Sequence, residues 1–398
     1  MFDYNLAFRQ QLQAIKDENR YREFVGLQRT LGTLPFANHN GEKVTVWCIN
    51  DYLGMSQHPA VINAAQKSLW QHGLGSGGTR NIGGNSASIL RLEDTISKLH
   101  NKESALVFTS GYVANEATLT AVAKAVPDVV YFSDELNHAS IIAGIGHSRA
   151  EKYIYKHLDM NDLEEKLKTI PYERPKMIVF ESAYSMNGMI APLKKICELA
   201  KRFNAMTYID EVHSVGLYGK GGAGIAQMYG VSDEIDIIQG TLAKAYGTIG
   251  GYISGKSEII DTVRSISRGF IFTTSLPPLI ADAANASIIH LMESDEEREK
   301  HQYVVKLLKK SLREVGIKFI ENDTHIVPVI IGDPKLVYQV SKLLLEKYKI
   351  FIQYINFPTV PRKTERLRIT PTPFHTEEMV HELVRILQAI FLELDIKQ

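Results

Sequence analysis

Five short apolar runs in the middle of the chain constrain its fold more than any other feature. They read ALVFTS, VVYFSDE, KMIVFES, AMTYIDE and IDIIQGT, and each ends in small or polar residues. Amphipathic segments such as LKKICELAKRF separate several of them. Nearly continuous apolar strands that alternate with helices are typical of a mostly parallel sheet covered by helices on both faces. The sequence therefore predicts an α/β fold here.

Polar residues close these runs and are expected to lie at one edge of the sheet. In parallel sheets the carboxyl ends of the strands meet at that edge, and ligands gather there. Polar strand ends also occur simply because they meet solvent, so this edge is only a candidate site. The polar closing residues are Ser110, Ser133, Glu181, Asp210, Glu211 and Thr241.

The rest of the chain differs from this alternating middle. A helix is expected from Met1 to about Glu23, because apolar residues fall on one side there. Towards the C-terminus, long helical stretches are followed by the short apolar runs IVPVII, IFIQYI and RLRIT. We therefore expect an N-terminal segment at 1–52, a large domain at 53–280 and a smaller α+β domain at 281–398.

Composition and charge exclude several classes of protein. The chain has 398 residues, with 45 Lys and Arg against 45 Asp and Glu, so it lacks the basic excess of nucleic-acid-binding proteins. Cys48 and Cys197 form no C-x-x-C pair, so neither a disulfide framework nor a cysteine metal site is expected. No apolar run approaches the roughly 18 residues of a membrane span, and the start does not resemble a leader. We expect a cytoplasmic protein without a metal, a membrane or a nucleic-acid partner.

A glycine-rich stretch, GLGSGGTRNIGG at 73–84, begins with the letters G-x-G-x-x-G of a dinucleotide-binding loop. Such a loop needs a strand directly before it and a helix that opens within it. Here a helical pattern precedes the stretch, and the next helix starts only near Ser86. A dinucleotide site is therefore not predicted, and a non-catalytic nucleotide-binding module stands as the alternative from another functional class.

Lys244 is the candidate for covalent chemistry. It lies in TLAKAYG, between an apolar strand and a glycine pair. Burial among small and apolar residues favours the neutral amine, and a neutral amine can form a Schiff base with an aldehyde cofactor. Taken alone, Lys244 is better explained as an ordinary surface lysine in a loop.

The residues expected to lie near Lys244 indicate pyridoxal phosphate as the cofactor. This cofactor needs a lysine, an acid for its ring nitrogen and donors for its phosphate. Asp210 supplies an acid at a strand end, and Thr241 offers a hydroxyl three residues before the lysine. Gly111 and Tyr112 open a helix whose backbone N–H groups suit an anion. His138 offers a flat ring to stack on the cofactor.

Long motifs occur along nearly the whole chain: TVWCINDYLGM, GSGGTRNI, LNHASII, FESAYSMNG, YIDEVHSVGLYG, GTLAKAYG, GFIFTTSLPP, and INFPTVPR followed by ERLRITPTP. In this order they resemble the α-oxoamine synthase family of pyridoxal-phosphate enzymes. The resemblance implies fold type I, with a large cofactor-binding domain and a smaller C-terminal α+β domain. It also implies a homodimer with the active site at the subunit interface.

The resemblance implies roles around the cofactor. Lys244 would form the Schiff base and act as the catalytic base, and Asp210 would pair with the ring nitrogen. His213 would contact the ring oxygen, Ser185 would lie against the cofactor, and His138 would stack on its face. The phosphate would be held by Gly111, Tyr112 and Thr241, joined by Thr273 and Thr274 from the second subunit.

The resemblance also implies substrate contacts. Arg368 would bind the amino-acid carboxylate as a bidentate fork, assisted by Asn50. The distal carboxylate of the acyl group would be received by Arg22, Thr79, Asn81 and Ile82. The acyl-CoA side would be contacted by Ser133, Lys152 and Thr359.

The implied reaction is the decarboxylating condensation of glycine with succinyl-CoA, which gives 5-aminolevulinate, CoA and CO2 for tetrapyrrole (haem) synthesis. Sister enzymes accept another amino acid or acyl-CoA with nearly the same cofactor residues, so Lys244 and Asp210 do not decide between them. Three letters depart from the family pattern, namely Gly83, Ile89 and Ala243. They leave loop rigidity and acyl selectivity open.

Overall fold

The computed structural model describes residues 2–397. The chain falls into two compact units, which are described separately. The large unit comprises Leu53–Ser185 and Met189–Arg298. The small unit comprises the residues up to Tyr52, Met186–Gly188 and the residues from Glu299 onward.

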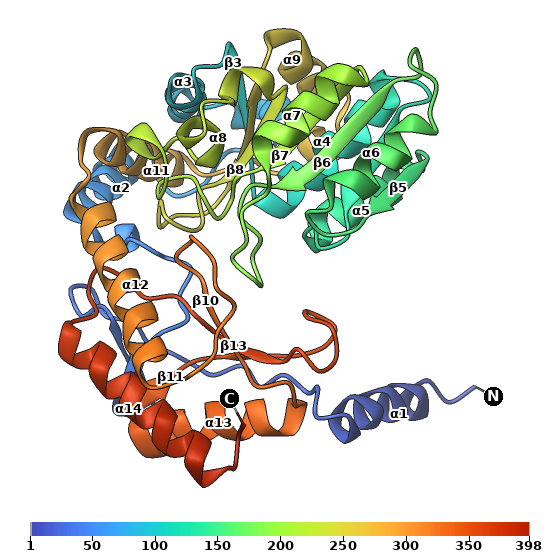
Figure 1. Cartoon of the computed structure of the whole chain (residues 1–398). Helices are drawn as coiled ribbons and strands as arrows, with labels where there is room; N and C mark the ends of the chain where they lie inside the picture. The colour runs from blue at the N-terminus through green and yellow to red at the C-terminus, as the bar shows by residue number, and fades with distance from the viewer. Residues whose placement is uncertain (1, 398) are drawn as a thin grey trace. The chain divides into compact units, whose positions relative to one another are not determined.

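A seven-stranded sheet forms the centre of the large unit, in the order β3-β9-β8-β7-β6-β4-β5 (Figure 1). The strands β5, β4, β6, β7 and β8 are parallel, whereas β9 is antiparallel to both β3 and β8. The predicted α/β class with a mostly parallel sheet is confirmed. The strands are β3 (Ser104–Phe108), β4 (Val130–Asp134), β5 (Lys152–Tyr155), β6 (Lys176–Glu181), β7 (Ala205–Asp210), β8 (Ile237–Thr241) and β9 (Gly251–Gly255).

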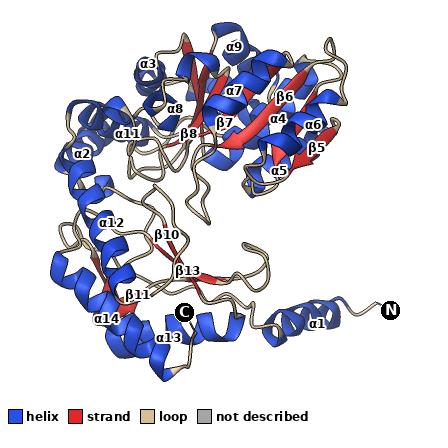
Figure 2. Ribbon diagram, in the orientation of Figure 1, coloured by secondary structure: helices blue, strands red, loops and turns tan. Residues whose placement is uncertain are grey.

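Burial explains why these runs are continuously apolar. Every residue of β4, β6, β8 and β9 is buried, because helices cover the sheet (Figure 2). The longer helices are α2 (Pro59–His72), α3 (Ala87–His100), α4 (Gly111–Ala125), α5 (Ala139–Ser148), α6 (Met160–Lys168), α7 (Leu193–Arg202), α9 (Ser257–Ile266) and α11 (Pro278–Glu293). The short helical turns are Met55–Gln57, Arg80–Gly84, Lys220–Gly222, α8 (Ile225–Met228), Ser232–Glu234 and α10 (Arg268–Ile271).

The strand register aligns the polar strand ends. Glu181 of β6 pairs with Asp210 of β7, and Asp210 pairs with Gln239 of β8. Glu181 and Asp210 are the last residues of β6 and β7, and Gln239 lies two residues before the end of β8. They therefore share the carboxyl edge of the sheet, where ligands of such folds bind.

Two small sheets and three long helices build most of the small unit. One sheet has the order β1-β2-β11, and the other has the order β10-β13-β12. Apolar side chains of both sheets and of α12, α13 and α14 form one core cluster. The elements are α1 (Tyr4–Asp17), β1 (Phe36–His39), β2 (Glu42–Val46), α12 (Glu296–Glu314), β10 (Val327–Ile330), α13 (Pro334–Tyr348), β11 (Ile350–Phe351), β12 (Tyr354–Ile355), β13 (Arg366–Ile369) and α14 (Glu377–Glu393).

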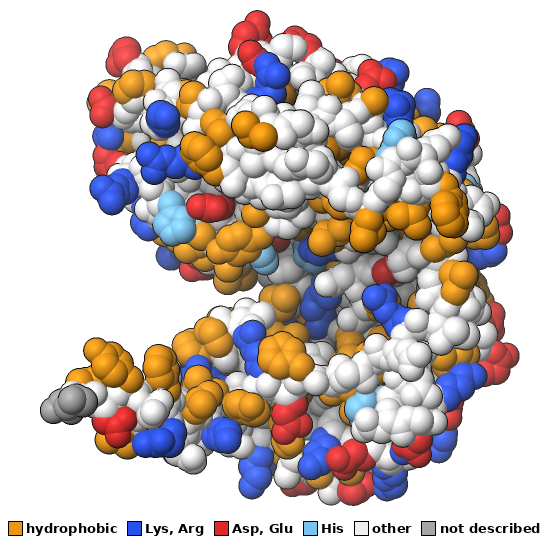
Figure 3. Space-filling model, turned by 180° about the vertical axis from the view of Figure 1, so that it is seen from behind, with side chains coloured by type: hydrophobic (Ala, Val, Ile, Leu, Met, Phe, Trp, Pro, Cys, Tyr) orange, Lys and Arg blue, Asp and Glu red, His pale blue; other side chains and the backbone are white. Residues whose placement is uncertain are grey.

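The first helix is shorter than the sequence suggested. Met1 lies outside the described residues, and α1 spans Tyr4–Asp17. It stops because Asn19 takes a left-handed backbone conformation with φ 52°. No residue of α1 is buried, and its apolar side chains lie at the surface (Figure 3).

The boundary between the units lies at Arg298 and Glu299, whereas the sequence suggested residue 280. The helix α11 accounts for the difference, since it packs on α2 and α3 of the large unit. The large unit thus includes the first turn of α12. Within 2–397, none of the helices combines the length and the apolar character that a membrane span requires.

Candidate active site

Lys244 faces His213 in the large unit. Lys244 follows β8 in a tight loop, in which Leu242 accepts a hydrogen bond from the N–H of Thr248 (2.9 Å) and donates one to the carbonyl of Gly250 (3.0 Å). The Nζ of Lys244 lies 2.7 Å from Nε2 of His213, which is buried in the turn after β7. The loop thus holds the amine beside an imidazole that can share its proton.

Asp210 is a buried carboxylate with a fixed orientation. Its Oδ2 accepts a hydrogen bond from Nδ2 of Asn115 (2.8 Å), and its Oδ1 accepts one from the N–H of Val212 (2.9 Å). Asn115 in turn accepts a bond from the hydroxyl of Tyr208 (2.7 Å). The donors shown are neutral, so they orient the carboxylate without neutralising it. Such a carboxylate can bind a protonated ring nitrogen.

Gly111 lets the start of α4 pack closely against β8. The cap residue Ser110 accepts a bond from the N–H of Val113 (3.1 Å). A Cβ on Gly111 would lie 3.2 Å from Nε2 of Gln239 and 3.5 Å from Oγ1 of Thr241. The missing side chain therefore brings a helix N-terminus beside a hydroxyl, which suits a phosphate group.

His138 caps the start of α5. Its Nδ1 accepts a bond from the N–H of Ser140 (3.2 Å). Desolvation by the surrounding protein lowers the pKa of His138; Lys244 adds to this effect, and Asp210 opposes it. The ring lies edge-on to Tyr112, with 6.4 Å between the centroids. A neutral, accessible ring of this kind can stack on a flat cofactor.

Two other acids at this edge have different roles. Glu211 accepts bonds from the backbone N–H groups of Ile225 (3.0 Å) and Ala226 (2.7 Å), so it holds the chain in place. Glu181 is buried beside Asp210. Burial raises the pKa of Glu181 well above its usual range, and the charge of Asp210 adds to the increase. Burial therefore favours the neutral form of Glu181.

The glycine-rich stretch is a turn fastened to a neighbouring segment. Thr79 forms an antiparallel bridge with Thr274. The hydroxyl of Ser275 donates to the carbonyls of Gly78 (3.1 Å) and Gly84 (2.7 Å). A Cβ on Gly84 would lie 2.2 Å from the carbonyl oxygen of Gly78, so only glycine fits. Close backbone approach therefore explains this glycine without a nucleotide.

The side chains of this turn point in different directions. Arg80 forms a bidentate pair with Glu93, at 2.8 and 2.9 Å, and fixes the turn to α3. Asn81 and Ile82 are exposed, and the side chain of Ile82 is 74% exposed. The two predicted substrate residues are thus accessible, while the arginine between the predicted Thr79 and Asn81 is structural.

Arg368 is a buried cation of the small unit. It lies on β13 and is 7% exposed. Its Nη2 donates to the hydroxyl of Tyr52 (3.1 Å), and its Nη1 lies 3.4 Å from Oδ1 of Asn50. The structure therefore brings together Arg368 and Asn50, and their role as a carboxylate site stays a prediction.

Arg22 and Thr359 also lie together in the small unit. The Nη2 of Arg22 donates to Oγ1 of Thr359 at 2.7 Å, although 337 positions separate them in sequence. Both side chains are exposed. Two residues predicted to meet the acyl substrate therefore form one accessible polar pair.

The remaining predicted residues occupy varied positions. Ser133 is 1% exposed, and its hydroxyl accepts a bond from Nδ2 of Asn137 (2.9 Å), so it lies inside the large unit. Lys152 is exposed on the edge strand β5. Ser185 and Thr273 are half-buried.

Sequence reasoning missed the neutral residues that orient the charged ones. Asn115 fixes Asp210, Tyr52 contacts Arg368, and Gln239 lies against Gly111. One signal was present in the sequence: Asn115 interrupts a helix that is otherwise rich in small and apolar residues.

The large unit fits pyridoxal phosphate on its own geometry. It offers an amine at Lys244, a buried carboxylate at Asp210 and a helix N-terminus at Gly111 that lies beside the hydroxyl of Thr241. These are the three groups that the cofactor requires.

Comparisons with known proteins agree with this geometry. Residues 42–387 match the family model "Aminotransferase class I and II". The chain is 58% identical over 394 residues to a 5-aminolevulinate synthase of Rickettsia conorii, covering 99% of this chain and 95% of the relative. It is 48% identical to a 5-aminolevulinate synthase of Bradyrhizobium diazoefficiens, covering 100% and 98%. A solved serine palmitoyltransferase from S. paucimobilis, with PLP and myriocin bound, has a TM-score of 0.92, 28% identity and full coverage of both chains.

Proposed function

Because the chain belongs to the aminotransferase class I and II family, and within it to the 5-aminolevulinate synthases, we propose that it condenses glycine with succinyl-CoA. The products are 5-aminolevulinate, CoA and CO2, and the pathway served is tetrapyrrole synthesis. The observation that carries the proposal is the pair Lys244 and His213, 2.7 Å apart, in the same unit as the buried carboxylate of Asp210.

Pyridoxal phosphate, when bound, supplies an aldehyde for amines and a ring that accepts electron density. Lys244 would hold the cofactor, and its Nζ would take the α-proton of glycine. His213, 2.7 Å from that amine, would position it and share its proton. Asp210 would keep a proton on the ring nitrogen, because Asn115 holds the carboxylate in one orientation. His138 would cover one face of the ring, and Ser185 would lie against it.

The phosphate is proposed to lie at the start of α4, where Gly111, Tyr112 and Thr241 provide N–H and hydroxyl donors. The protein is proposed to be a homodimer with the active site at the subunit interface. In it, Thr273 and Thr274 reach the phosphate bound by the other subunit. The bridge between Thr274 and Thr79 supports a link between this segment and the substrate loop.

The small unit supplies cations for two carboxylates. Arg368 matches the planar geometry of the glycine carboxylate, and Asn50 assists it. Arg22 and Thr359 form an accessible pair for the succinyl end. The other proposed acyl-CoA contacts are Thr79, Asn81, Ile82 and Lys152. Ser133 is only 1% exposed, so its burial does not support the contact predicted for it.

The competing function is that of a sister acyltransferase, since the solved serine palmitoyltransferase shares the fold. One comparison separates the two. Release of CoA is measured with glycine present, from succinyl-CoA and from acetyl-CoA in parallel, and then with serine in place of glycine. We expect a preference for succinyl-CoA and for glycine. A preference for acetyl-CoA or for serine would overturn the proposal.

We also propose a cytoplasmic location. The support comes from Cys48 and Cys197, which are free thiols in the structure, as is usual in a reducing compartment. Fractionation of the producing cells, with activity assayed in each fraction, tests it. Activity that stays with the membrane or periplasmic fraction would contradict it.

A further inference from the structure

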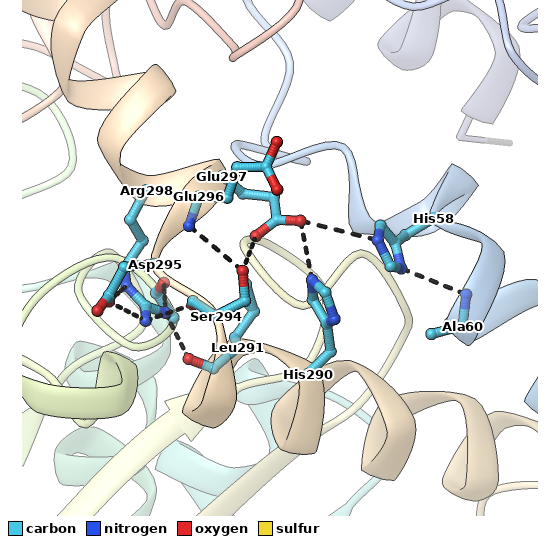
Figure 4. A network of polar contacts seen from close by, with 10 residues as sticks. His58, Ala60, His290, Leu291, Ser294, Asp295, Glu296, Glu297 and Arg298 are labelled. Carbon is cyan, nitrogen blue, oxygen red and sulfur yellow. Dashed lines mark hydrogen bonds and ion pairs between the residues drawn. The ribbon is translucent and has the colours of Figure 1, made fainter.

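Two histidines and a glutamate converge in the large unit and have no part in the proposed reaction. His58 precedes α2, His290 lies in the last turn of α11, and Glu297 lies in the first turn of α12 (Figure 4). One possible ligand atom of each residue lies within 4.8 Å of those of the other two. Three helix ends therefore bring three metal-ligating side chains to one point.

The carboxylate of Glu297 is oriented between the two rings. Its Oε1 lies 2.8 Å from Nε2 of His290 and 3.7 Å from Nε2 of His58. Its Oε2 accepts a bond from the hydroxyl of Ser294 (3.2 Å). The side chains of His58, His290 and Glu297 are 26%, 25% and 16% exposed, so an ion and a water molecule can reach them.

The neighbouring charges favour a cation here. Arg298 directs its guanidinium away from the cluster, to the carbonyls of Leu291 (2.7 Å) and Ser294 (2.6 Å) and to the carboxylate of Asp295 (Figure 4). Glu296 adds a second negative charge near His58. The positive charge of Arg298 is thus satisfied elsewhere.

We propose that His58, His290 and Glu297 bind one divalent transition-metal ion of the zinc class, with water completing the coordination. Two imidazoles and one carboxylate are typical ligands for zinc, cobalt and nickel, whereas magnesium and calcium prefer oxygen ligands alone. Three protein ligands leave a position for an exchangeable water. The site stands independently of the proposed reaction.

Ligation changes two local hydrogen bonds. The Nε2 of His290 lies 2.8 Å from Oε1 of Glu297, and an ion held by these two atoms replaces that bond. The Nδ1 of His58 accepts a bond from the N–H of Ala60 at 3.3 Å. If Nε2 of His58 binds the ion, the proton moves to Nδ1, and this long bond is also lost. The ion then joins the start of α2, the end of α11 and the start of α12. Because only the folded chain presents the three ligands together, the metal raises the temperature of unfolding.

The test uses the untagged holoenzyme, with Zn²⁺ added in a calorimetric titration and in thermal unfolding. The wild-type protein should bind one Zn²⁺ per chain at this cluster and unfold at a higher temperature with zinc, but not with Mg²⁺. H290Q and H58N should each lower the zinc affinity by about 100-fold or more, since the loss of an outer partner alone costs roughly 10–100-fold. Asparagine at 58 still caps α2, so H58N reports the metal rather than the fold.

The matched control is H147N. His147 contacts Glu116 at 3.0 Å, as one exposed histidine with one glutamate, and its loss should leave zinc binding unchanged. Two results would overturn the proposal: a wild-type protein whose unfolding temperature is unaffected by Zn²⁺, or H290Q and H58N variants that bind Zn²⁺ as tightly as the wild type. Binding of Mg²⁺ as tight as that of Zn²⁺ would overturn the assigned class of metal.

Discussion

The two units hold charge in different ways. In the large unit, Asp210 and Lys244 lie at or just beyond strand ends, and the parallel register brings them to one edge. In the small unit, Arg368 meets Asn50 and Tyr52 across more than 300 positions of sequence. We assign the cofactor to the first arrangement and the substrate carboxylate to the second. Because the two arrangements lie in different units, we expect cofactor binding and substrate recognition to be lost through different substitutions.

The largest effect is expected for K244A, which removes the amine at the large-unit site. Loss of a base alone lowers turnover by about 10²–10⁴-fold, and the loss of the covalent attachment adds to this. The rate of 5-aminolevulinate formation and the visible absorbance of the bound cofactor measure both effects. K256A, which changes an exposed lysine, serves as the control. Similar rates in K244A and K256A would refute the role of Lys244.

The next effect is expected for R368A, which breaks the small-unit site alone. Truncating one partner of a charged, hydrogen-bonded contact costs about 2–5 kcal/mol, so kcat/KM for glycine should fall accordingly. Cofactor absorbance should be unchanged, because the large unit holds the cofactor. R366K is the control. Arg366 donates a structural hydrogen bond to the carbonyl of Met186 (2.8 Å), so its replacement should affect stability and leave kcat/KM for glycine nearly unchanged. A loss of cofactor in R368A would remove the separation proposed above.

Two neighbouring acids of the large unit separate catalysis from stability. D210N should abolish most turnover, because an amide cannot hold the ring proton. Both variants place a new NH₂ group against an N–H donor, which is Val212 or Asn115 for D210N and Ile225 or Ala226 for E211Q. Each should therefore lose about 1–3 kcal/mol of unfolding free energy, whereas E211Q should keep most of its turnover. Turnover assays and chemical unfolding of both variants, each with cofactor bound, measure this, and a loss of turnover in E211Q as large as that in D210N would contradict the assigned roles.

Glu211 also gives a pH dependence with a defined sign. Burial raises the pKa of Glu211 above its usual value near 4.5, and its hydrogen bonds only partly oppose this. The folded state therefore binds the proton more tightly than the unfolded state, and this group's contribution to stability falls as pH rises above the unfolded value. E211Q should remove the part of the decrease in stability with rising pH that is due to Glu211. Unfolding curves of both proteins at several pH values measure it, and identical slopes would contradict the assignment.

The smallest effect is expected for T79A, in the turn that we assign to acyl recognition. The bridge between Thr79 and Thr274 uses the backbone, so the turn should persist. Loss of one hydroxyl contact costs about 0.5–1.5 kcal/mol, which predicts a few-fold rise in KM for succinyl-CoA with unchanged cofactor retention. S76A in the same loop is the control. Equal loss of cofactor and of acyl-CoA use would mean that the turn is only structural.

The large unit was more predictable from sequence than the small unit. Continuous apolar runs indicated the parallel sheet, and the acid at the end of one run proved to be buried Asp210. The end of α1 at Asp17 was missed because it depends on the backbone conformation of Asn19. The contacts of Arg368 with Tyr52 and of Asp210 with Asn115 were missed because neutral partners carry no charge pattern. The cluster of His58, His290 and Glu297 was missed because helix packing alone brings it together.

The fate of the glycine carboxyl group distinguishes the proposed condensation from other reactions of glycine and succinyl-CoA. The protein is incubated with cofactor, succinyl-CoA and glycine labelled with ¹³C at its carboxyl carbon, and the products are analysed by mass spectrometry. We predict equal amounts of CoA, CO2 and 5-aminolevulinate, with the label in CO2 and none in 5-aminolevulinate. Label retained in the amino acid product, or release of CoA without 5-aminolevulinate, would contradict the account.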